Sequence, residues 1–306
     1  MLFKEYLLNY VSRKYFADIK NSSRTTLWRK FAPLLKVRLS PMKISHTHRA
    51  RIASVDGFYI AYPSLLRNRC KEGYKRDKCI LLWTFDCETH KPIYWQFYDE
   101  IENMGIWKRY IIEMKRNGIY PEYLTHDGHP GITTACAKYL PKTKEQRCTV
   151  HLMFNMRKDL SISPKTSIAK ELKSLVAQVQ RVKTLADADS WNKLWIDYCG
   201  KYQETIKSML ANKDTYDNGI RVPGLYKSAF SVINHAFQRD EIFTYVNDPS
   251  VPNSSNAIES NNGVLREVLA RHRGLSLELR KNLVSWVLAF RQEQTTAQIK
   301  QQITKK

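Results

Sequence analysis

The stretch YLTHDGHPGI, from Tyr123 to Ile132, decides the fold, because it is typical of a short buried strand that ends in an acid and turns directly into a helix. Gly128 and Pro130 favour a turn. The residues that follow, GITTACAKYLP, have a helical pattern. An unpaired carboxylate at the end of a buried strand is costly. Asp127 therefore needs a partner or a function.

The segments around this stretch predict a mixed sheet with helices. RIASVDGFYIAY has the β-branched and aromatic content of a strand, and CILLWTFDCETH with KPIYWQFYDEIE predicts a hairpin. MGIWKRYIIEMKRNG has apolar residues at helical intervals and stops at Gly118. EQRCTVHLMF is interpreted as another strand. The predicted order is β-β-β-α-β-α-β, from Arg51 to Phe154.

The rest of the chain is predicted to be helical. Residues 155 to 246 have polar and charged helical faces with a break at DNGIRVPG, which indicates an insertion domain or a second helical domain. A proline-rich loop then leads into a basic helix that contains Glu259, and a final amphipathic helix follows. The fold class is α/β. We expect four segments: 1–50, basic and helical; 51–154, the first part of the sheet domain; 155–250, the helical insertion; and 251–306, the closing helices.

The composition indicates a polyanionic partner. Lys and Arg total 50 against 29 Asp and Glu in 306 residues, so the net charge is +21 and the pI about 9.7. DNA, RNA or an anionic membrane surface would fit this charge. No apolar run approaches the roughly 18 residues of a membrane-spanning helix, and the N-terminus lacks a signal-peptide pattern. Six cysteines form no CxxC pair. We therefore expect a soluble intracellular protein with reduced thiols.

Residues 1 to 50 are especially basic, with 11 Lys and Arg against two acids. SRTTLWRKFAPLLKVRL predicts a basic amphipathic helix that could bind phosphates. A solvated pair of accessory helices explains the same pattern equally well.

Three acids stand out as candidate metal ligands. Asp56 lies within the first predicted strand, Asp127 ends the fourth, and Glu259 begins the late helix. They are 71 and 132 residues apart, so only tertiary folding can bring them together. Gathered carboxylates repel one another unless a divalent cation lies among them, and Mg²⁺ prefers oxygen ligands. Two such ions could activate a water or a 3′-hydroxyl in phosphodiester displacement.

Each acid also has a structural explanation. Asp-Gly is a common turn signal, which covers Asp56 and Asp127. Asn256 as an N-cap with Glu259 three residues later resembles a capping box. Asp86 also ends an apolar strand, but it precedes CETHKP, which is typical of a hairpin turn, so we rank it below the other three.

Four further side chains near these acids are candidates with open roles. His126 and His129 flank Asp127 and could touch metal or phosphate, although exposed turn histidines are commoner. Cys148 and His151 have the spacing of half a zinc site, with no second half evident. Positions three apart face opposite sides of a strand, so a shared metal would require a helical or bent backbone there. Their spacing alone favours packing roles.

Four ordered blocks resemble one protein family. SVDGFYI, THDGHPGITTACAKYLP, QRCTVHLMFN and NSSNAIESNNGVLR are similar, in that order, to the signature blocks of Mutator-like transposases and their bacterial insertion-sequence relatives. The similarity covers about Arg51 to Arg273. It implies an RNase H-like catalytic domain with a D-D-E triad, interrupted by an all-α insertion before the glutamate. The sequence itself adds short helical N-terminal and C-terminal segments.

The resemblance assigns the triad to Asp56, Asp127 and Glu259, as both catalytic residues and ligands of two Mg²⁺ ions, with Mn²⁺ as a substitute. Its C-x2-H element falls on Cys148 and His151, which become residues of the active domain without an assigned role. Family members usually have a larger N-terminal DNA-binding region, whereas here about 50 residues without cysteine precede the first strand. We expect end recognition to be reduced or to fall to the first helices and the insertion.

Candidate DNA contacts follow the late helix. Arg266 is seven residues after Glu259, nearly two helical turns, so it shares that face and could hold a phosphate. Arg271 and Arg273 extend the basic track, and Arg147 is a further candidate. A solvated basic face explains the three helical arginines as well. Trp191 and Trp195, four residues apart, could stack on an unpaired base, but core packing is the commoner role for such a pair.

The leading functional hypothesis is a transposase that binds element ends, cleaves DNA and joins the freed 3′ end to a target. A non-enzymatic DNA-binding derivative is the main alternative, and an RNase H-like nuclease without joining activity is a weaker one. The expected partners are double-stranded DNA and a second copy of the chain, because synapsis holds two DNA ends together. The expected location is the cytoplasm of a prokaryote, with its nucleoid, or a eukaryotic nucleus.

Overall fold

The computed structural model describes residues 2–8, 13–42, 50–60, 79–160 and 163–304. The chain forms two compact units. The first unit comprises Met1–Pro121, Thr134–Pro141 and Asn256–Lys306, and the second comprises Glu122–Thr133 and Lys142–Ser255. The four-segment division expected from the sequence stays a prediction.

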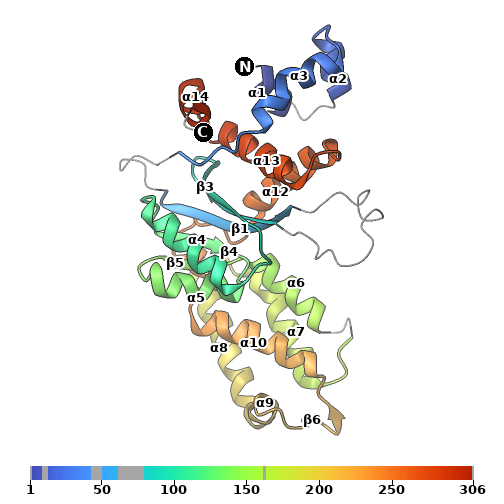
Figure 1. Ribbon diagram of the computed structural model, residues 1–306. Coiled ribbons are helices and arrows are strands. Elements are labelled where there is room, and N and C mark those ends of the chain that lie inside the picture. Colours follow the sequence, from blue (N-terminus) through green and yellow to red (C-terminus); the bar gives the residue numbers. More distant parts are fainter. Residues whose placement is uncertain (1, 9–12, 43–49, 61–78, 161–162, 305–306) are drawn as a thin grey trace. The chain divides into compact units, whose positions relative to one another are not determined.

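The first unit combines strands with helices from both ends of the chain (Figure 1). Its elements are α1 (Leu2–Leu8), α2 (Arg13–Ile19), α3 (Arg24–Leu35), β1 (Ile52–Ile60), β2 (Cys79–Asp86), β3 (Lys91–Tyr98), α4 (Met104–Arg116), α12 (Asn256–Arg271), α13 (Leu277–Arg291) and α14 (Thr296–Thr304).

The second unit is mainly helical. Its elements are β4 (Tyr123–His126), β5 (Lys144–Arg147), α6 (Thr149–Asp159), α7 (Ser167–Gln178), the 3₁₀ turn η2 (Val179–Arg181), α8 (Leu185–Lys201), α9 (Gln203–Leu210), β6 (Tyr216–Asp217), β7 (Ile220–Arg221), α10 (Gly224–Gln238) and α11 (Thr244–Asn247). Helix α5 (Pro130–Tyr139) begins in this unit and ends in the first.

The predicted α/β class and the strand and helix order from Arg51 to Phe154 are confirmed, with one correction. EQRCTVHLMF is not a single strand, because β5 ends at Arg147 and α6 begins at Thr149. Beyond the end of the strand, the Thr149 N–H donates to the carbonyl of Asn253 at 2.9 Å instead of to a neighbouring strand. Cys148 and His151 therefore lie at a helix start, the bent backbone that a shared ligand would require.

Strand β2 is the centre of the sheet in the first unit. It pairs antiparallel with both β1 and β3, and all of its residues are buried. Alternate side chains face opposite sides of a strand. Trp83 and Phe85 join a core with Leu283 of α13. Thr84, between them, exchanges a hydrogen bond of 2.6 Å with the hydroxyl of Tyr110 on α4. Helices thus cover both faces of this strand.

The N-terminal helices pack on α13. Phe3 of α1 lies 5.2 Å from Trp286 between ring centroids, and Phe31 of α3 lies 5.0 Å from Phe3. The Trp286 indole N–H donates to the Leu34 carbonyl at 3.0 Å. The apolar side of the basic amphipathic helix therefore faces the core, as its pattern predicts.

In the second unit, β4 and β5 pair in parallel, and an aromatic core holds the helices together. Trp191 and Trp195 of α8 are 2% and 1% exposed, and their rings stack with centroids 5.8 Å apart. This confirms core packing as their role. The DNGIRVPG break holds a small hairpin, β6–β7, which the helical pattern did not predict. Its turn residues Asn218 and Gly219 both have positive φ, the requirement of a two-residue type I′ turn.

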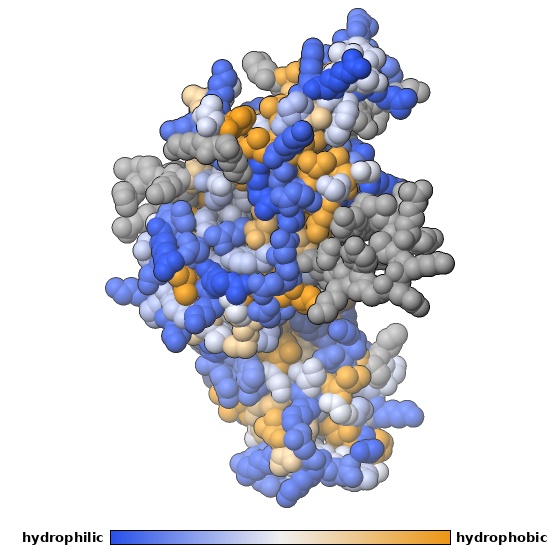
Figure 2. Space-filling view, in the orientation of Figure 1, coloured by the Kyte–Doolittle hydropathy of each residue, from blue (hydrophilic) through white to orange (hydrophobic). Residues whose placement is uncertain are grey.

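The helices of the described residues include none long and apolar enough to cross a membrane. Figure 2 shows that the face it presents is mostly hydrophilic, with apolar side chains scattered over it. Such scattering is normal for a protein surface.

Trp195→Ala should lower the free energy of unfolding by about 3 to 5 kcal/mol, because it removes a buried ring from the centre of an aromatic cluster. Urea denaturation followed by far-UV circular dichroism measures this loss. The matched control is Ile196→Ala, because Ile196 is the next residue of α8 and is 59% exposed. It should cost within about 0.5 kcal/mol. Equal losses in the two variants would contradict the packing role.

Candidate active site

Asp127 follows β4 directly and forms a local turn. One of its carboxylate oxygens, Oδ1, accepts the backbone N–H of His129 at 2.9 Å. Gly128, the next residue, has φ +84°, a conformation that favours glycine. The carboxylate is half-buried rather than enclosed. The strand therefore ends before the acid, and a backbone hydrogen bond offsets part of the cost of its burial.

The side chain of His126 holds the backbone of this turn by a hydrogen bond. It is fully buried, which corrects the expectation of an exposed turn histidine. Its Nδ1 accepts the Gly128 N–H at 3.0 Å, so a neutral ring has its proton on Nε2 and donates to Glu145 Oε2 at 3.1 Å. His129 is half-buried, and its Nδ1 accepts the Gly131 N–H at 3.0 Å.

Arg147 lies beneath the same turn. It is 6% exposed and donates through Nη2 to the Gly128 carbonyl at 3.2 Å. Burial lowers the pKa of its guanidinium, while the negative charges of Glu241 and Asp127 act in the opposite direction. The side chain is enclosed beside Gly128, where it supports the Asp127 turn. The expectation that Arg147 contacts DNA stays a prediction.

An ion cluster with two buried carboxylates extends from this turn. Arg239 donates through Nη2 to Glu145 Oε1 at 2.6 Å and through Nε to Glu241. The Glu241 side chain is 1% exposed, and the Glu145 side chain 9%. Buried carboxylates are tolerated when a cation and hydrogen bonds satisfy them. The cluster connects β5 and the end of α10 to the turn that contains Asp127.

Asp56 lies within β1 of the first unit, and both of its carboxylate oxygens accept a hydrogen bond. The Gly57 N–H donates to Oδ1 at 2.8 Å, and the Asn262 amide donates to Oδ2 at 2.5 Å. Asn262 belongs to α12, which packs against β1. The first predicted acid is thus held by the helix that contains Glu259, one turn before Asn262.

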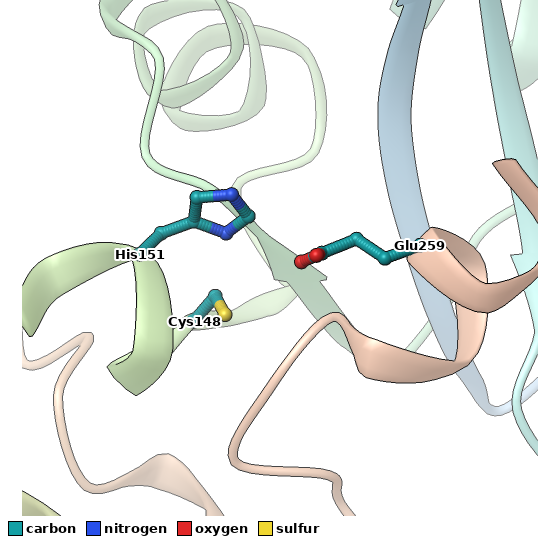
Figure 3. Close-up of side chains that lie close together, drawn as sticks. All are labelled: Cys148, His151 and Glu259. Atoms are coloured by element: carbon teal, nitrogen blue, oxygen red, sulfur yellow. The ribbon is translucent and has the colours of Figure 1, made fainter. Parts of the chain in front are cut away.

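Cys148 and His151 lie at the start of α6, and Glu259 lies in the first turn of α12; Figure 3 shows the three side chains and the turns that contain them. Their residue types are all metal ligands. Cys148 belongs to the second unit and Glu259 to the first.

Ser255 bridges Cys148 and His151 within the second unit. The Ser255 N–H donates to Cys148 Sγ at 3.2 Å, and its hydroxyl lies 3.3 Å from His151 Nδ1. Burial raises the pKa of the Cys148 thiol, but hydrogen bonds from His151 and Ser255 outweigh it, so the net pKa is lowered. Cys148 and His151 are therefore linked to each other and to Ser255 by hydrogen bonds. Their role in the active domain stays a prediction.

The candidate DNA-binding arginines of α12 and its end are exposed. The Arg266 guanidinium lies 5.8 Å from the centroid of the Phe58 ring, above β1. Arg271 donates to Glu267 Oε2 at 3.2 Å, and Arg273 donates to the Ala270 carbonyl at 3.1 Å. Their exposure leaves a phosphate contact open to each.

The structure supports the hairpin-turn explanation of Asp86 but not the capping-box explanation of Glu259. Asp86 is 2% exposed and accepts hydrogen bonds from the backbone of Glu88 and the hydroxyl of Thr89, so it caps the hairpin turn. Helix α12 begins at Asn256 itself, so Asn256 is not the N-cap that the capping-box explanation requires. The joint role of Asp56, Asp127 and Glu259 stays a prediction.

Sequence reasoning missed Asn262, Trp83, Glu145 and Arg239. Asn262 had a usable signal, because a polar residue three positions after Glu259 lies near it on the same helix face. The other three had none, because each meets its partner through tertiary folding.

Three comparisons place the chain among known proteins. The model of the family described as "Transposase, Mutator family" matches residues 65–220, just over half of the chain. A curated relative from Lactobacillus helveticus, the transposase for insertion sequence element IS1201, is 23% identical over 210 residues. That match covers 62% of this chain and 55% of the relative, so the chain spans about half of the relative's length.

Two solved structures have weaker likeness. The Drosophila P element transposase strand transfer complex has a TM-score of 0.45 and 12% identity, covering 96% of this chain and 91% of that chain. The Mos1 transposase paired-end complex with left transposon end has a TM-score of 0.22 and 15% identity, covering 77% of this chain and 75% of that chain. TM-scores below 0.5 do not establish a shared fold.

Gly128→Ala should destabilise the chain more than Gly118→Ala. Both glycines have similar positive φ, +84° and +81°, so an alanine at either pays the same backbone cost, about 1 to 2 kcal/mol. At Gly128 the new Cβ would also lie 2.2 Å from Arg147, whereas at Gly118 it meets nothing within 4 Å. Urea denaturation of both variants measures the difference, which we expect to exceed about 1 kcal/mol. Equal losses would show that the chain accommodates the new Cβ beside Arg147 without cost and would contradict this prediction.

Proposed function

The chain belongs to the Mutator family of transposases, and we propose that it cuts DNA at the ends of a mobile element and joins the freed 3′ ends to target DNA. The matched family region contains Asp127, Cys148 and His151. The observation that carries the proposal is the pairing of Asp56 with α12. A buried amide of this helix holds Asp56, and Glu259 lies on the preceding turn of the same helix.

The proposed catalytic fold is RNase H-like. Two features support it: three antiparallel strands in the first unit, with Asp56 on β1, and a parallel pair in the second unit, with Asp127 directly after β4. In this proposal the helices from the end of α6 through α11 correspond to the insertion before the glutamate. In this proposal residues 1–50 form an accessory segment, 51–154 and 251–306 the catalytic core, and 155–250 the insertion.

Asp56, Asp127 and Glu259 are the proposed catalytic acids and the ligands for two Mg²⁺ ions, with Mn²⁺ as a substitute. Their chemistry fits hard cations, which prefer carboxylate oxygens. The hydrogen bonds described above for Asp56 and Asp127 come from neutral donors, which orient the carboxylates without cancelling their negative charge. When bound, the ions lower the pKa of the attacking hydroxyl and stabilise the leaving oxygen.

The protein's own groups hold these acids in place. The Asn262 amide orients Asp56, while the buried side chains of His126 and Arg147 hold the backbone of the turn that contains Asp127. Preorganised ligands cost no rearrangement when the substrate arrives. His129 donates its backbone N–H to Asp127, and Cys148 with His151 is proposed to support the active domain.

The proposed partners are double-stranded DNA, both element ends and target, and a second copy of the chain. The net charge of +21 favours DNA, because phosphate neutralisation supplies most non-specific affinity. Arg266, Arg271 and Arg273 are the proposed phosphate contacts, since all three are exposed near the helix that contains Glu259. A homodimer or higher oligomer would hold two ends for synapsis.

A non-enzymatic DNA-binding derivative is the second candidate. It would keep the basic surface without needing the acids, and the presence of Asp56, Asp127 and Glu259 favours the enzyme over it. An RNase H-like nuclease that cuts without joining uses the same metal site, so only the reaction products separate it from a transposase.

Asp127→Asn and Glu259→Gln should each lower strand transfer by at least about 1000-fold, because each removes a ligand charge from the metal site. The assay joins DNA bearing the element's own ends to a plasmid in Mg²⁺ or Mn²⁺, under conditions where all proteins bind DNA equally. Chelation by EDTA should stop cutting and joining, and added Mg²⁺ should restore both.

Asp86→Asn is the matched control, because it makes the same chemical change at an acid that caps a hairpin turn. It should retain joining. A wild-type chain that binds the ends but neither cuts nor joins, while an active relative works in the same assay, would favour the DNA-binding derivative. Cutting without joining would favour the nuclease.

A further inference from the structure

Asn262 is a buried polar residue with a position next to the proposed metal ligands. It is 2% exposed and lies on α12 three residues after Glu259, so both residues lie near the same face of this helix. Its Nδ2 donates to Asp56 Oδ2 at 2.5 Å. A buried amide needs partners for both its oxygen and its nitrogen, so the other end of this side chain decides what it does.

Trp83 fixes the orientation of the Asn262 amide. The indole Nε1–H donates to Asn262 Oδ1 at 3.1 Å. An indole N–H is only a donor and an ionised carboxylate only an acceptor, so a single orientation of the amide satisfies both neighbours. The reversed amide would place its oxygen against the Asp56 carboxylate and its NH₂ group against the indole N–H, losing both hydrogen bonds.

The three residues come from three packed elements of the first unit. Trp83 of β2 lies directly opposite Asp56 of β1 in the antiparallel register, and α12 packs against β1. Trp83 is 1% exposed. The hydrogen bonds from Trp83 to Asn262 and from Asn262 to Asp56 therefore connect both strands and the helix. Both donor side chains, Trp83 and Asn262, are buried.

The type of donor is chemically important. A lysine or arginine in the place of Asn262 would neutralise Asp56 and compete with a metal ion, and an acid there would repel it. A neutral amide orients the carboxylate without adding a positive charge that would compete with a cation. The Gly57 N–H on Oδ1 is a second neutral donor to the same carboxylate.

We infer that Asn262 is a positioning residue that, oriented by Trp83, holds the Asp56 carboxylate ready for a divalent cation; this inference rests on the proposed function of Asp56 as a metal ligand. Groups that orient metal ligands in this way change metal affinity or activity by about 10- to 100-fold when they are removed. Asn262 acts through Asp56, so its effect should appear in metal binding before any DNA is present.

The test is Mn²⁺ binding to the full chain without DNA, measured by electron paramagnetic resonance of the free ion. Asn262→Leu has nearly the same size and lacks both polar atoms, and it should weaken Mn²⁺ binding by at least about 10-fold. Trp83→Phe keeps an aromatic ring and removes the indole donor, so it should weaken binding in the same direction by a smaller factor. Asp56→Asn provides the reference for loss of the ligand itself.

Asn261→Leu is the matched control. Asn261 is the preceding residue of α12, and its amide donates to the Ala257 carbonyl at 2.7 Å instead of to an acid. This variant should bind Mn²⁺ as the wild type does. Far-UV circular dichroism and the melting temperature of each variant without metal verify that the fold is kept, and Trp83→Phe tests the inference if Asn262→Leu does not fold.

The outcomes separate this inference from the proposed function. Weaker Mn²⁺ binding in Asn262→Leu and Trp83→Phe, with normal binding in Asn261→Leu, supports the positioning role. If Asn262→Leu binds Mn²⁺ like the wild type while Asp56→Asn does not, Asp56 remains a ligand and the inference about Asn262 is wrong. If Asp56→Asn binds Mn²⁺ like the wild type, both the inference and the assignment of Asp56 fail.

Discussion

The packing of α12 against β1 is the constraint on which the candidate site of the first unit depends. It places a helix from the end of the chain over the strand that contains Asp56, and Asn262 joins the two by a hydrogen bond to the carboxylate. The apolar side of α12, with Ile258 and Leu265, belongs to the same core as β2 and α13. Apolar burial therefore fixes the position of the helix, while one buried amide fixes the orientation of the acid.

Buried polar side chains also support Asp127 in the second unit, but they hold the backbone of its turn instead of its carboxylate. Its turn has little apolar side chain of its own, and two buried polar side chains hold its backbone: the His126 ring accepts the Gly128 N–H, and Arg147 donates to the Gly128 carbonyl. Buried charge is costly unless it is paired. The pairing of Arg239 with Glu145 and Glu241 makes this arrangement possible, and it leaves the Asp127 carboxylate half-buried with only neutral donors described on it.

The basic character of the chain has two distinct uses. Arg147 is buried in the second unit, and the exposed Arg239 pairs with the buried carboxylates of Glu145 and Glu241. Arg266, Arg271 and Arg273 are exposed and remain available to a phosphate backbone. Net charge alone cannot separate these uses, because the neighbours that tertiary folding supplies decide whether an arginine pairs with a carboxylate or stays available to a polyanion.

The sequence by itself determined the α/β class, the element order from Arg51 to Phe154 and the family of the chain. Those properties depend on local periodicity, turn residues such as Gly118 and Gly128, and ordered motifs, which are all encoded over short stretches. It also placed Asp127 at a strand end and Glu259 in the first turn of a helix.

Only the tertiary structure decided which side chains act together. Residues 83 and 262 are 179 apart in the chain, and their hydrogen bond exists because α12 packs over the sheet. The same holds for the burial of His126, which turn chemistry favoured as exposed, and for the burial of Arg147 beside Gly128. The start of α6 at Thr149 likewise depended on the distant Asn253 carbonyl. Long-range packing and the satisfaction of buried polar groups set these details, and a pattern of neighbouring residues does not record them.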